Sequence, residues 1–167
     1  MLGMNDEDIE RVKNYLLFDL SFLLNDTGVP PGWVPQTGPW DWPAPGDYTI
    51  TSSFGTRVDP ITGAAGFHEG VDIAGDIGLR VVAARRGVVV SSGWSGGYGN
   101  LVILDHGDGV RTCYAHLSAI SVSNGQVVEK GQEVGRMGST GRSTGPHLHF
   151  QVNVNGKPVN PLSFFGG

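Results

Sequence analysis

Residues 145–152 read Gly-Pro-His-Leu-His-Phe-Gln-Val and predict a β-strand with a reactive face. From Leu148 onward apolar and polar residues alternate, and successive side chains on a strand point to opposite faces. Leu148 and Phe150 should therefore face a hydrophobic core, while His147 and His149 share the polar face. Two neighbouring imidazoles suit a metal site or a proton-transfer site, although two surface histidines on a half-exposed strand would give the same pattern.

The same alternation recurs in short runs from Tyr48 to the end of the chain, and 27 glycines supply the turns between them. The predicted strands are Tyr48–Ser52, Val81–Ala84, Gly87–Ser92, Leu101–His106, Val110–His116, Val127–Val128, Glu133–Gly138 and Leu148–Val154. Residues 81–89 and 127–135 also share a rhythm of strand, glycine turn and strand. Strands of this spacing predict an all-β fold, an antiparallel sandwich or barrel.

The first 47 residues differ from the rest in charge and composition. They hold eight acidic and two basic residues, a net charge of −6, whereas the remaining 120 residues carry +1. Residues 1–28 predict an amphipathic helix, because apolar residues recur every three or four positions. Residues 29–47 contain six prolines and three tryptophans, which predict an extended linker lying along a domain of residues 48–167. No basic footprint for nucleic acid is present.

The predicted helix carries more apolar side chains than one stripe requires, so it should dock on this domain, self-associate or pack on an upstream domain. Its apolar run, residues 16–24, is too short to span a bilayer and contains Asp19. The acidic N-terminus does not read as a signal peptide. The single cysteine, Cys113, allows no internal disulfide, which fits a cytosolic protein or a secreted bacterial protein without disulfides. An exported chain would then be a piece of a longer protein that carries the targeting segment.

His68 and Asp72 stand four residues apart, with Gly70 between them. In one extended chain such positions face the same way, and Gly70 leaves room for a close approach. An imidazole and a carboxylate on one face could bind a divalent cation such as zinc. Taken alone, the pair is better explained as a surface histidine beside an acid.

His116 ends a predicted strand, and alternation puts it on the same face as Tyr114. Cys113 should then lie on the opposite face, as a small buried hydrophobe and not as a nucleophile or ligand. His106 precedes Gly107-Asp108-Gly109, a tight hairpin turn, and is expected to be structural.

These segments together resemble the lysostaphin/LytM-type zinc metallopeptidases, which cut peptide bonds in bacterial cell-wall peptidoglycan. The resemblance covers residues 51–161, and its separated motifs follow the order of the family. They are Ser53–Arg57 with Pro60–Gly63, His68-x-x-x-Asp72, Asn100 with Leu101–Gly107, Tyr114–Ser118 with Gly125–Val128, and Gly141-x-Ser143-Thr144-Gly145-Pro146-His147-Leu148-His149-Phe150.

The resemblance implies a role for five residues. His68, Asp72 and His149 would hold the zinc ion, and His116 and His147 would be the catalytic histidines. It also implies an antiparallel β-sandwich or barrel of the duplicated hybrid motif type, with an open groove walled by loops near residues 56–67, 93–100 and 138–145. The chain is then expected to be an extracytoplasmic zinc endopeptidase that acts on peptidoglycan peptides with zinc-activated water as the nucleophile.

Two other functions compete with hydrolysis. One is a non-catalytic cell-wall-binding or scaffold module on the same fold, but all five site residues are present. The other is a phosphotransfer domain of the sugar-uptake system, which would leave His68 and Asp72 without a task. Which of His116 and His147 acts as the base stays open, as does the peptide bond that is cleaved.

Overall fold

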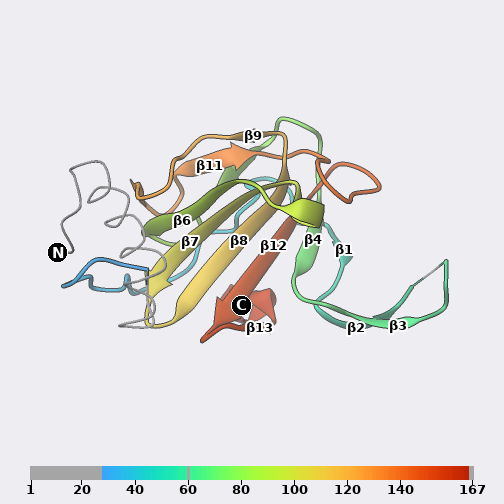
Figure 1. The fold of residues 1–167 in the computed structure, drawn as a ribbon, viewed down its shortest axis with the longest axis horizontal. Helices are drawn as coiled ribbons and strands as arrows, with labels where there is room; N and C mark the ends of the chain where they lie inside the picture. The colour runs from blue at the N-terminus through green and yellow to red at the C-terminus, as the bar shows by residue number, and fades with distance from the viewer. Residues whose placement is uncertain (1–27, 60, 166–167) are drawn as a thin grey trace, which may run out of the picture.

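The computed structural model describes residues 28–59 and 61–165, and nearly all of its regular structure is antiparallel β-strand (Figure 1). The all-β prediction is therefore confirmed, while the predicted helix over residues 1–28 lies almost wholly outside the described residues. The elements are β1 (Ile50–Ser52), β2 (Gly55–Val58), β3 (Ala65–His68), β4 (Val71–Ala74), β5 (Arg80–Val82), β6 (Gly87–Trp94), η1 (Gly96–Tyr98), β7 (Asn100–Gly107), β8 (Val110–Leu117), β9 (Ala119–Ile120), β10 (Val127–Val128), β11 (Glu133–Arg136), β12 (His147–Val154), β13 (Lys157–Val159) and η2 (Pro161–Phe164).

The main sheet has the strand order β1-β4-β12-β8-β7-β6-β10, and β13 also pairs with β12. Its long strands lie side by side across the molecule (Figure 1). β12 sits between β4 and β8, so the strand predicted from the histidine pair is a central strand whose two neighbours fix its position. In the described part of the chain no helix is long and apolar enough to cross a bilayer.

A smaller sheet of order β5-β11-β9 packs against one face of the main sheet and closes the core. The two segments that share a sequence rhythm form the link between the layers. β10 pairs with β6 through Val127 and Val88, and β11 pairs with β5 through Glu133 and Val82. Each copy of the repeated pattern therefore gives one strand to each sheet, which is the duplication that the sequence predicted.

The core holds the apolar face of β12, as alternation predicted. Leu148, Phe150 and Val152 are completely buried, and the Phe150 ring packs 5.4 Å from the ring of Tyr114 on β8. Burying a large apolar side chain contributes about 1.5–3 kcal/mol. The opposite face of the same strand is thereby held rigidly in register, and that face carries His147 and His149.

The proline-rich segment lies along the β-domain, as expected. Trp33 donates a hydrogen bond from its indole nitrogen to the carbonyl oxygen of His106, and Trp40 stacks 4.5 Å from Phe164. Ala44 is completely buried within the core cluster. The tryptophans therefore attach this segment to the domain through specific contacts.

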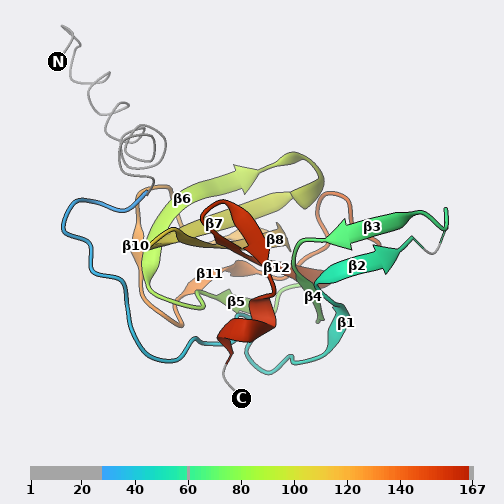
Figure 2. The ribbon, with the colours of Figure 1, turned by 90° about the horizontal axis from the view of Figure 1, so that it is seen from below.

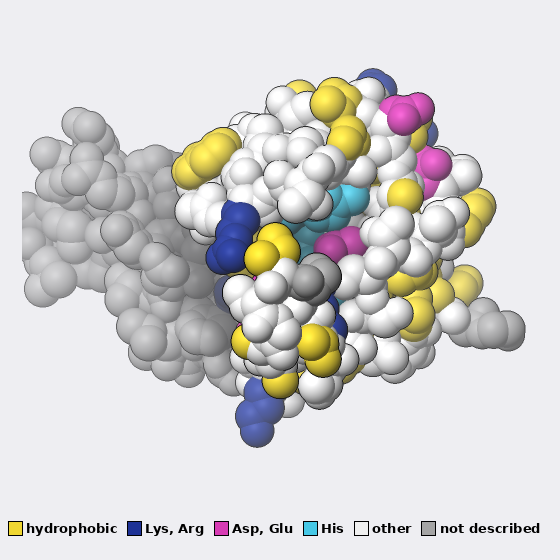
Figure 3. Space-filling model, turned by 90° about the vertical axis from the view of Figure 1, so that its right-hand side faces the viewer, with side chains coloured by type: hydrophobic (Ala, Val, Ile, Leu, Met, Phe, Trp, Pro, Cys, Tyr) yellow, Lys and Arg dark blue, Asp and Glu magenta, His cyan; other side chains and the backbone are white. Residues whose placement is uncertain are grey.

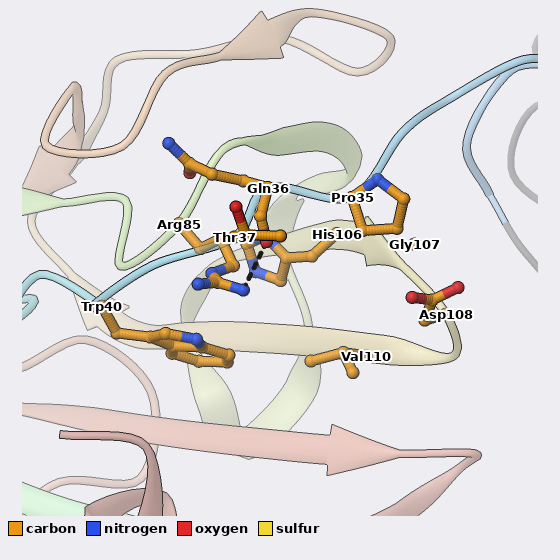
Figure 4. A pocket seen from close by; sticks show the side chains of 9 residues that line it. All are labelled: Pro35, Gln36, Thr37, Trp40, Arg85, His106, Gly107, Asp108 and Val110. Carbon is orange, nitrogen blue, oxygen red and sulfur yellow. Dashed lines mark hydrogen bonds between the residues drawn. The ribbon is translucent and has the colours of Figure 1, made fainter. Parts of the chain in front are cut away.

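A cavity of about 350 Å³ lies beneath this segment, next to His106 and Gly107 at the C-terminal end of β7. Figure 4 shows the indole of Trp40, the guanidinium of Arg85 and the side chains of Asp108 and Val110 around it. Arg85 donates hydrogen bonds to the carbonyl oxygens of Gln36 and Gly38. The arginine is thus part of the contact that holds the proline-rich segment in place.

The hairpin of β2 and β3 projects from the body of the domain in both ribbon views (Figures 1 and 2). Its strands pair from Gly55 with His68 to Val58 with Ala65. The sequence predicted a loop over residues 56–67, so the hairpin is a correction. Its side chains are almost all exposed, and an exposed ribbon lacks the alternation that marks a half-buried strand.

Candidate active site

All five predicted site residues line one cleft of about 620 Å³. The three predicted wall segments each contribute to it, through Arg57, through Gly97 and Tyr98, and through Arg142 to Thr144. Figure 3 shows histidine side chains at the bottom of this hollow. The cleft is open, which suits a segment of a polymer better than an enclosed small molecule.

Three potential metal-binding atoms converge at the floor of the cleft. His68 Nε2 lies 3.3 Å from His149 Nδ1 and 3.3 Å from Asp72 Oδ1, and His149 Nδ1 lies 3.0 Å from Asp72 Oδ1. Tetrahedral zinc binds nitrogen and oxygen at about 2.0–2.1 Å, which places two ligand atoms ~3.3 Å apart. The His68, Asp72 and His149 side chains therefore fit a tetrahedral zinc ion with three protein ligands.

Strand pairing brings two of these side chains together, because His149 on β12 is directly opposite Asp72 on β4. Directly opposed residues of an antiparallel pair share a face of the sheet. His68 arrives differently: it ends β3, which belongs to the projecting hairpin, whereas Asp72 lies in the main sheet. The prediction that His68 and Asp72 lie close is confirmed, but its premise of one extended chain was wrong.

Gly70 lies between these two strands and packs closely against β12. A Cβ atom at this position would lie 2.4 Å from the carbonyl oxygen of Phe150 and 2.9 Å from the His149 ring. Any side chain here would push against the backbone of β12 and against a candidate ligand. The close approach expected at Gly70 is therefore present, and it is an approach to β12.

The outer nitrogens of the two ligand-site histidines are held by hydrogen bonds. His68 Nδ1 lies 3.0 Å from the carbonyl oxygen of Ser53, which can only accept, so this nitrogen carries the proton and Nε2 is left for a metal. His149 Nε2 lies 3.0 Å from Gln151 Oε1, and the Gln151 amide donates to Asn153 Oδ1. Such partners fix the orientation and tautomer of ligating imidazoles.

Asp72 carries a negative charge in this setting. Burial raises the pKa of its carboxyl, but the adjoining His149 and His68 imidazoles outweigh burial and hold that pKa well below its ordinary value. The group is therefore ionised at neutral pH, in the protonation state that a metal ligand needs.

His116 reaches the cleft through an irregularity in β8. The β7–β8 register shifts between the pairs Asn100–Leu117 and Val102–Tyr114, and His116 has a positive φ of 64°. A bulge of this kind turns a side chain that regular alternation would send to the other face. Because Tyr114 lies in the core, unbroken alternation would have buried His116 beside it. The predicted location in the groove is confirmed, whereas alternation as its cause was wrong.

The bulge at His116 also changes the predicted position of the Cys113 side chain. It pairs with Gln151, and Ala115 pairs with His149, so Cys113 lies on the sheet face that carries the ligand-site histidine and not on the opposite face. The thiol is buried, and burial raises its pKa to about 12. It packs in a cluster with Leu101 and Ala115. The prediction that Cys113 is a small buried hydrophobe is therefore confirmed, and the prediction of its face was wrong.

His116 and His147 form a second pair in the cleft, with ring centroids 4.7 Å apart. His116 Nδ1 lies 2.7 Å from the carbonyl oxygen of Thr140, and His147 Nδ1 lies 2.8 Å from that of Gly145. Carbonyl oxygens only accept, so both Nδ1 atoms carry protons and both Nε2 atoms are available in the cleft. His147 Nε2 lies 3.7 Å from Asp72 Oδ1, beside the ligand atoms.

The two histidines of this pair sit in an environment suited to proton transfer. Burial lowers the pKa of His116 below its ordinary value, and the neighbouring His147 and His149 add to that effect. A neutral imidazole with a free Nε2 can accept a proton at neutral pH and return it later. By contrast, His106 is buried with Nδ1 2.9 Å from the Arg86 carbonyl oxygen, which confirms its structural role.

Several residues that line the cleft or support its histidines were not named as candidates from the sequence. Gln151 is two residues beyond His149 and so on the same face, which was a usable signal for a partner of the ligand. Tyr98, with its ring 5.8 Å from that of His149, had no signal beyond its place in a glycine-rich loop. Arg57 and Arg142 likewise come from wall segments, and only the folded chain brings them to one cleft.

Comparison with known proteins gives the cleft a family context. Residues 66–161 match the model of Peptidase family M23. The DD-carboxypeptidase/endopeptidase Mpg of Neisseria meningitidis serogroup B is 50% identical over 114 residues, which are 68% of this chain and 26% of that protein. The chain thus spans about a quarter of the length of this curated relative.

Solved structures agree with the sequence matches. A zinc containing peptidase from Vibrio cholerae has a TM-score of 0.68 and 39% identity, over 71% of this chain and 37% of its own. The catalytic domain of the antimicrobial peptidase lysostaphin from Staphylococcus simulans has a TM-score of 0.64 and 41% identity, over 70% of this chain and 91% of its own. This chain therefore belongs to Peptidase family M23, as its resemblance to the lysostaphin/LytM-type peptidases predicted.

Proposed function

We propose that this chain is a zinc-dependent endopeptidase that hydrolyses peptide bonds in bacterial cell-wall peptidoglycan, outside the cytoplasm. The observation that carries the proposal is the spacing of His68 Nε2, Asp72 Oδ1 and His149 Nδ1, at 3.0–3.3 Å from one another beside two further imidazoles. Three protein ligands leave a fourth position open, as in catalytic zinc sites. Membership of family M23 and the named activity of Mpg support peptide-bond hydrolysis. The Peptidoglycan DD-endopeptidase ShyA of Vibrio cholerae, 42% identical over 122 residues, supports peptidoglycan as the substrate.

In this proposal His68, Asp72 and His149 hold the metal. A bound zinc ion supplies Lewis acidity, which polarises a scissile carbonyl and lowers the pKa of a water molecule. Gln151 Oε1 accepts a hydrogen bond from His149 Nε2 and so orients the His149 ring. The Ser53 carbonyl oxygen orients the His68 ring in the same way, by accepting from His68 Nδ1. The ligand set is thus prepared by the strands before any metal binds, which reduces the reorganisation that binding requires.

His116 and His147 serve proton transfer in the same proposal. Each keeps its Nδ1 proton on a backbone carbonyl, so each can take or give a proton only at Nε2, inside the cleft. One, with a bare Nε2, acts as base toward water, and the other, protonated at Nε2 as an imidazolium, donates a hydrogen bond from that nitrogen to the oxyanion that develops on the substrate carbonyl. The proton then passes to the leaving amine, which completes hydrolysis of the amide.

Digestion of defined muropeptides, with the products identified by mass spectrometry, tests the proposal. We expect cleavage of a peptide bond by the zinc-loaded protein, none after chelation, and recovery when zinc is restored. Binding of muropeptides with no hydrolysis by fully zinc-loaded protein would instead support a non-catalytic cell-wall module. The products also identify the bond that is cleaved.

A further inference from the structure

The charges that line the cleft are unbalanced. Its cations are Arg57 and Arg142, and Asp72 is the sole acidic residue that lines it in the described part of the chain. Asp72 Oδ1 lies 3.0 Å from His149 Nδ1 and 3.3 Å from His68 Nε2, so this carboxylate belongs to the candidate metal site. Among residues 28–59 and 61–165, neither guanidinium has a carboxylate within ion-pair distance, although Asp59 lies near enough to Arg142 to interact with its charge. Two exposed guanidinium groups therefore face the cleft with no carboxylate of the described chain bound to them.

Arg57 sits close to the proposed metal ligands. It lies on β2 and donates from Nη1 to Ser52 Oγ at 2.5 Å, and Ser52 Oγ lies 3.3 Å from His68 Nδ1. The guanidinium is thus two polar contacts away from the His68 ring. The contact with Ser52 engages one Nη1 proton, while an arginine has five N–H donors in a fixed fork.

Arg142 approaches the same site from another wall. Its backbone N–H donates to the carbonyl oxygen of Gly97 at 2.8 Å, which ties its loop to the η1 segment. The next residue, Ser143, has its hydroxyl 3.3 Å from His147 Nδ1. Arg57 is therefore linked to the metal-site histidine His68 through Ser52, and Arg142 precedes the residue that contacts the proton-transfer histidine His147. Lys or Arg side chains are visible beside the histidine-lined hollow (Figure 3).

We propose that Arg57 and Arg142 bind a substrate carboxylate, so that the cleft selects peptides with a free carboxylate on the residue that leaves. This inference rests on the proposed endopeptidase function. In a peptide, the α-carboxyl carbon of the leaving residue is three bonds from the scissile carbonyl carbon, at most ~4 Å away. Arg57 lies two polar contacts from the His68 ring, so a carboxylate this close to the reacting carbon is within its reach. Guanidinium groups bind carboxylates through paired N–H donors, which gives both charge and geometric selectivity.

A matched pair of synthetic peptides tests the selectivity. The two share one sequence taken from the cleaved muropeptide and differ in a free carboxylate or a carboxamide on the leaving residue. The zinc-loaded wild-type protein should show a higher kcat/KM for the carboxylate peptide. Arg57→Gln and Arg142→Gln should each lower kcat/KM for that peptide about tenfold, because a hydrogen bond to a charged group contributes about that much. The ratio between the two peptides should then approach one.

Arg80→Gln is the matched control, since Arg80 is exposed on β5 and pairs with Glu133, away from the cleft. Zinc content and thermal unfolding of each variant show whether the fold is intact. An unchanged carboxylate-to-carboxamide ratio in both cleft variants would overturn the inference while leaving hydrolysis established. Equilibrium binding of both peptides to the same proteins separates the two proposals. An arginine-dependent preference in binding with no hydrolysis would uphold the carboxylate site and reject the endopeptidase.

Discussion

His68 Nε2 lies 3.3 Å from His149 Nδ1, although 81 positions separate the two residues in the chain. Since the Ser53 carbonyl holds the His68 proton on Nδ1 and Gln151 accepts from His149 Nε2, two nitrogen lone pairs face each other. Lone pairs at this distance repel unless a cation or a proton lies between them. The carboxylate of Asp72 adjoins both nitrogens, so a divalent cation satisfies all three atoms at once.

The first prediction is that His149→Ala loses zinc. The wild-type protein should carry about one zinc per chain, measured by elemental analysis after dialysis, and the variant should carry little. The fold should survive, because Leu148 and Phe150 supply the core side of β12. Equal zinc in the two proteins would show that His149 is not a ligand.

The second prediction separates the remaining histidines from the metal. His116→Ala and His147→Ala should each keep full zinc content and lose turnover by roughly 10²–10³-fold, the usual loss for a proton-transfer group or an oxyanion donor. Zinc analysis and muropeptide digestion on the same preparations test both parts. A variant without zinc would make its histidine a ligand, and a variant with near-normal turnover would exclude its histidine from proton transfer.

Strand β12 could be predicted because its apolar and polar residues alternate without a break. Leu148 and Phe150 fill the core while His147 and His149 face the cleft, which is the pattern read from residues 145–152. The hairpin of β2 and β3 escaped prediction for the converse reason, since its exposed side chains follow no period of two. The chemistry of the site was thus easier to predict than the shape of its walls.

The bulge at His116 could not be predicted from local sequence. A positive φ is uncommon for residues other than glycine and has no composition signal at this position. It follows from the register between β7 and β8, which depends on pairings made elsewhere in the sheet. Strict alternation therefore assigned Cys113 to the wrong face, even though its burial was predicted correctly.

The third prediction concerns the turn at Gly70. Gly70→Ala should weaken zinc binding and lower thermal stability, because the new Cβ atom would meet the Phe150 carbonyl oxygen at 2.4 Å and the His149 ring at 2.9 Å. Gly66→Ala is the control, since the nearest atom to its Cβ position is 3.9 Å away. Zinc titration and thermal unfolding should separate the two variants, and identical behaviour would contradict the proposed crowding.

The fourth prediction is a pH dependence of folding stability from His106. Burial lowers its pKa to about 4, while the unfolded chain has the ordinary value of 6.5. The unfolded state therefore binds more protons between these values, so stability is complete above pH 6.5 and falls as the pH drops toward 4. The contribution is on the order of 3 kcal/mol. Urea unfolding of zinc-free protein at pH 7 and pH 5 should show a smaller drop for His106→Gln than for wild type, and equal drops would refute it.

The fifth prediction concerns the proline-rich segment and the proposed domain boundary at residue 48. A chain beginning at Pro43 should bind zinc and cleave a small soluble peptide with similar turnover, because the cleft is lined by later residues. It should nevertheless unfold roughly 5–10 °C below a chain beginning at residue 28, since it lacks the Trp33 hydrogen bond and the stacking of Trp40 on Phe164. Calorimetry and peptide cleavage on both chains separate stability from chemistry. Equal unfolding temperatures would show that these tryptophan contacts contribute little. Loss of cleavage in a folded, zinc-loaded chain would make the segment part of the catalytic unit.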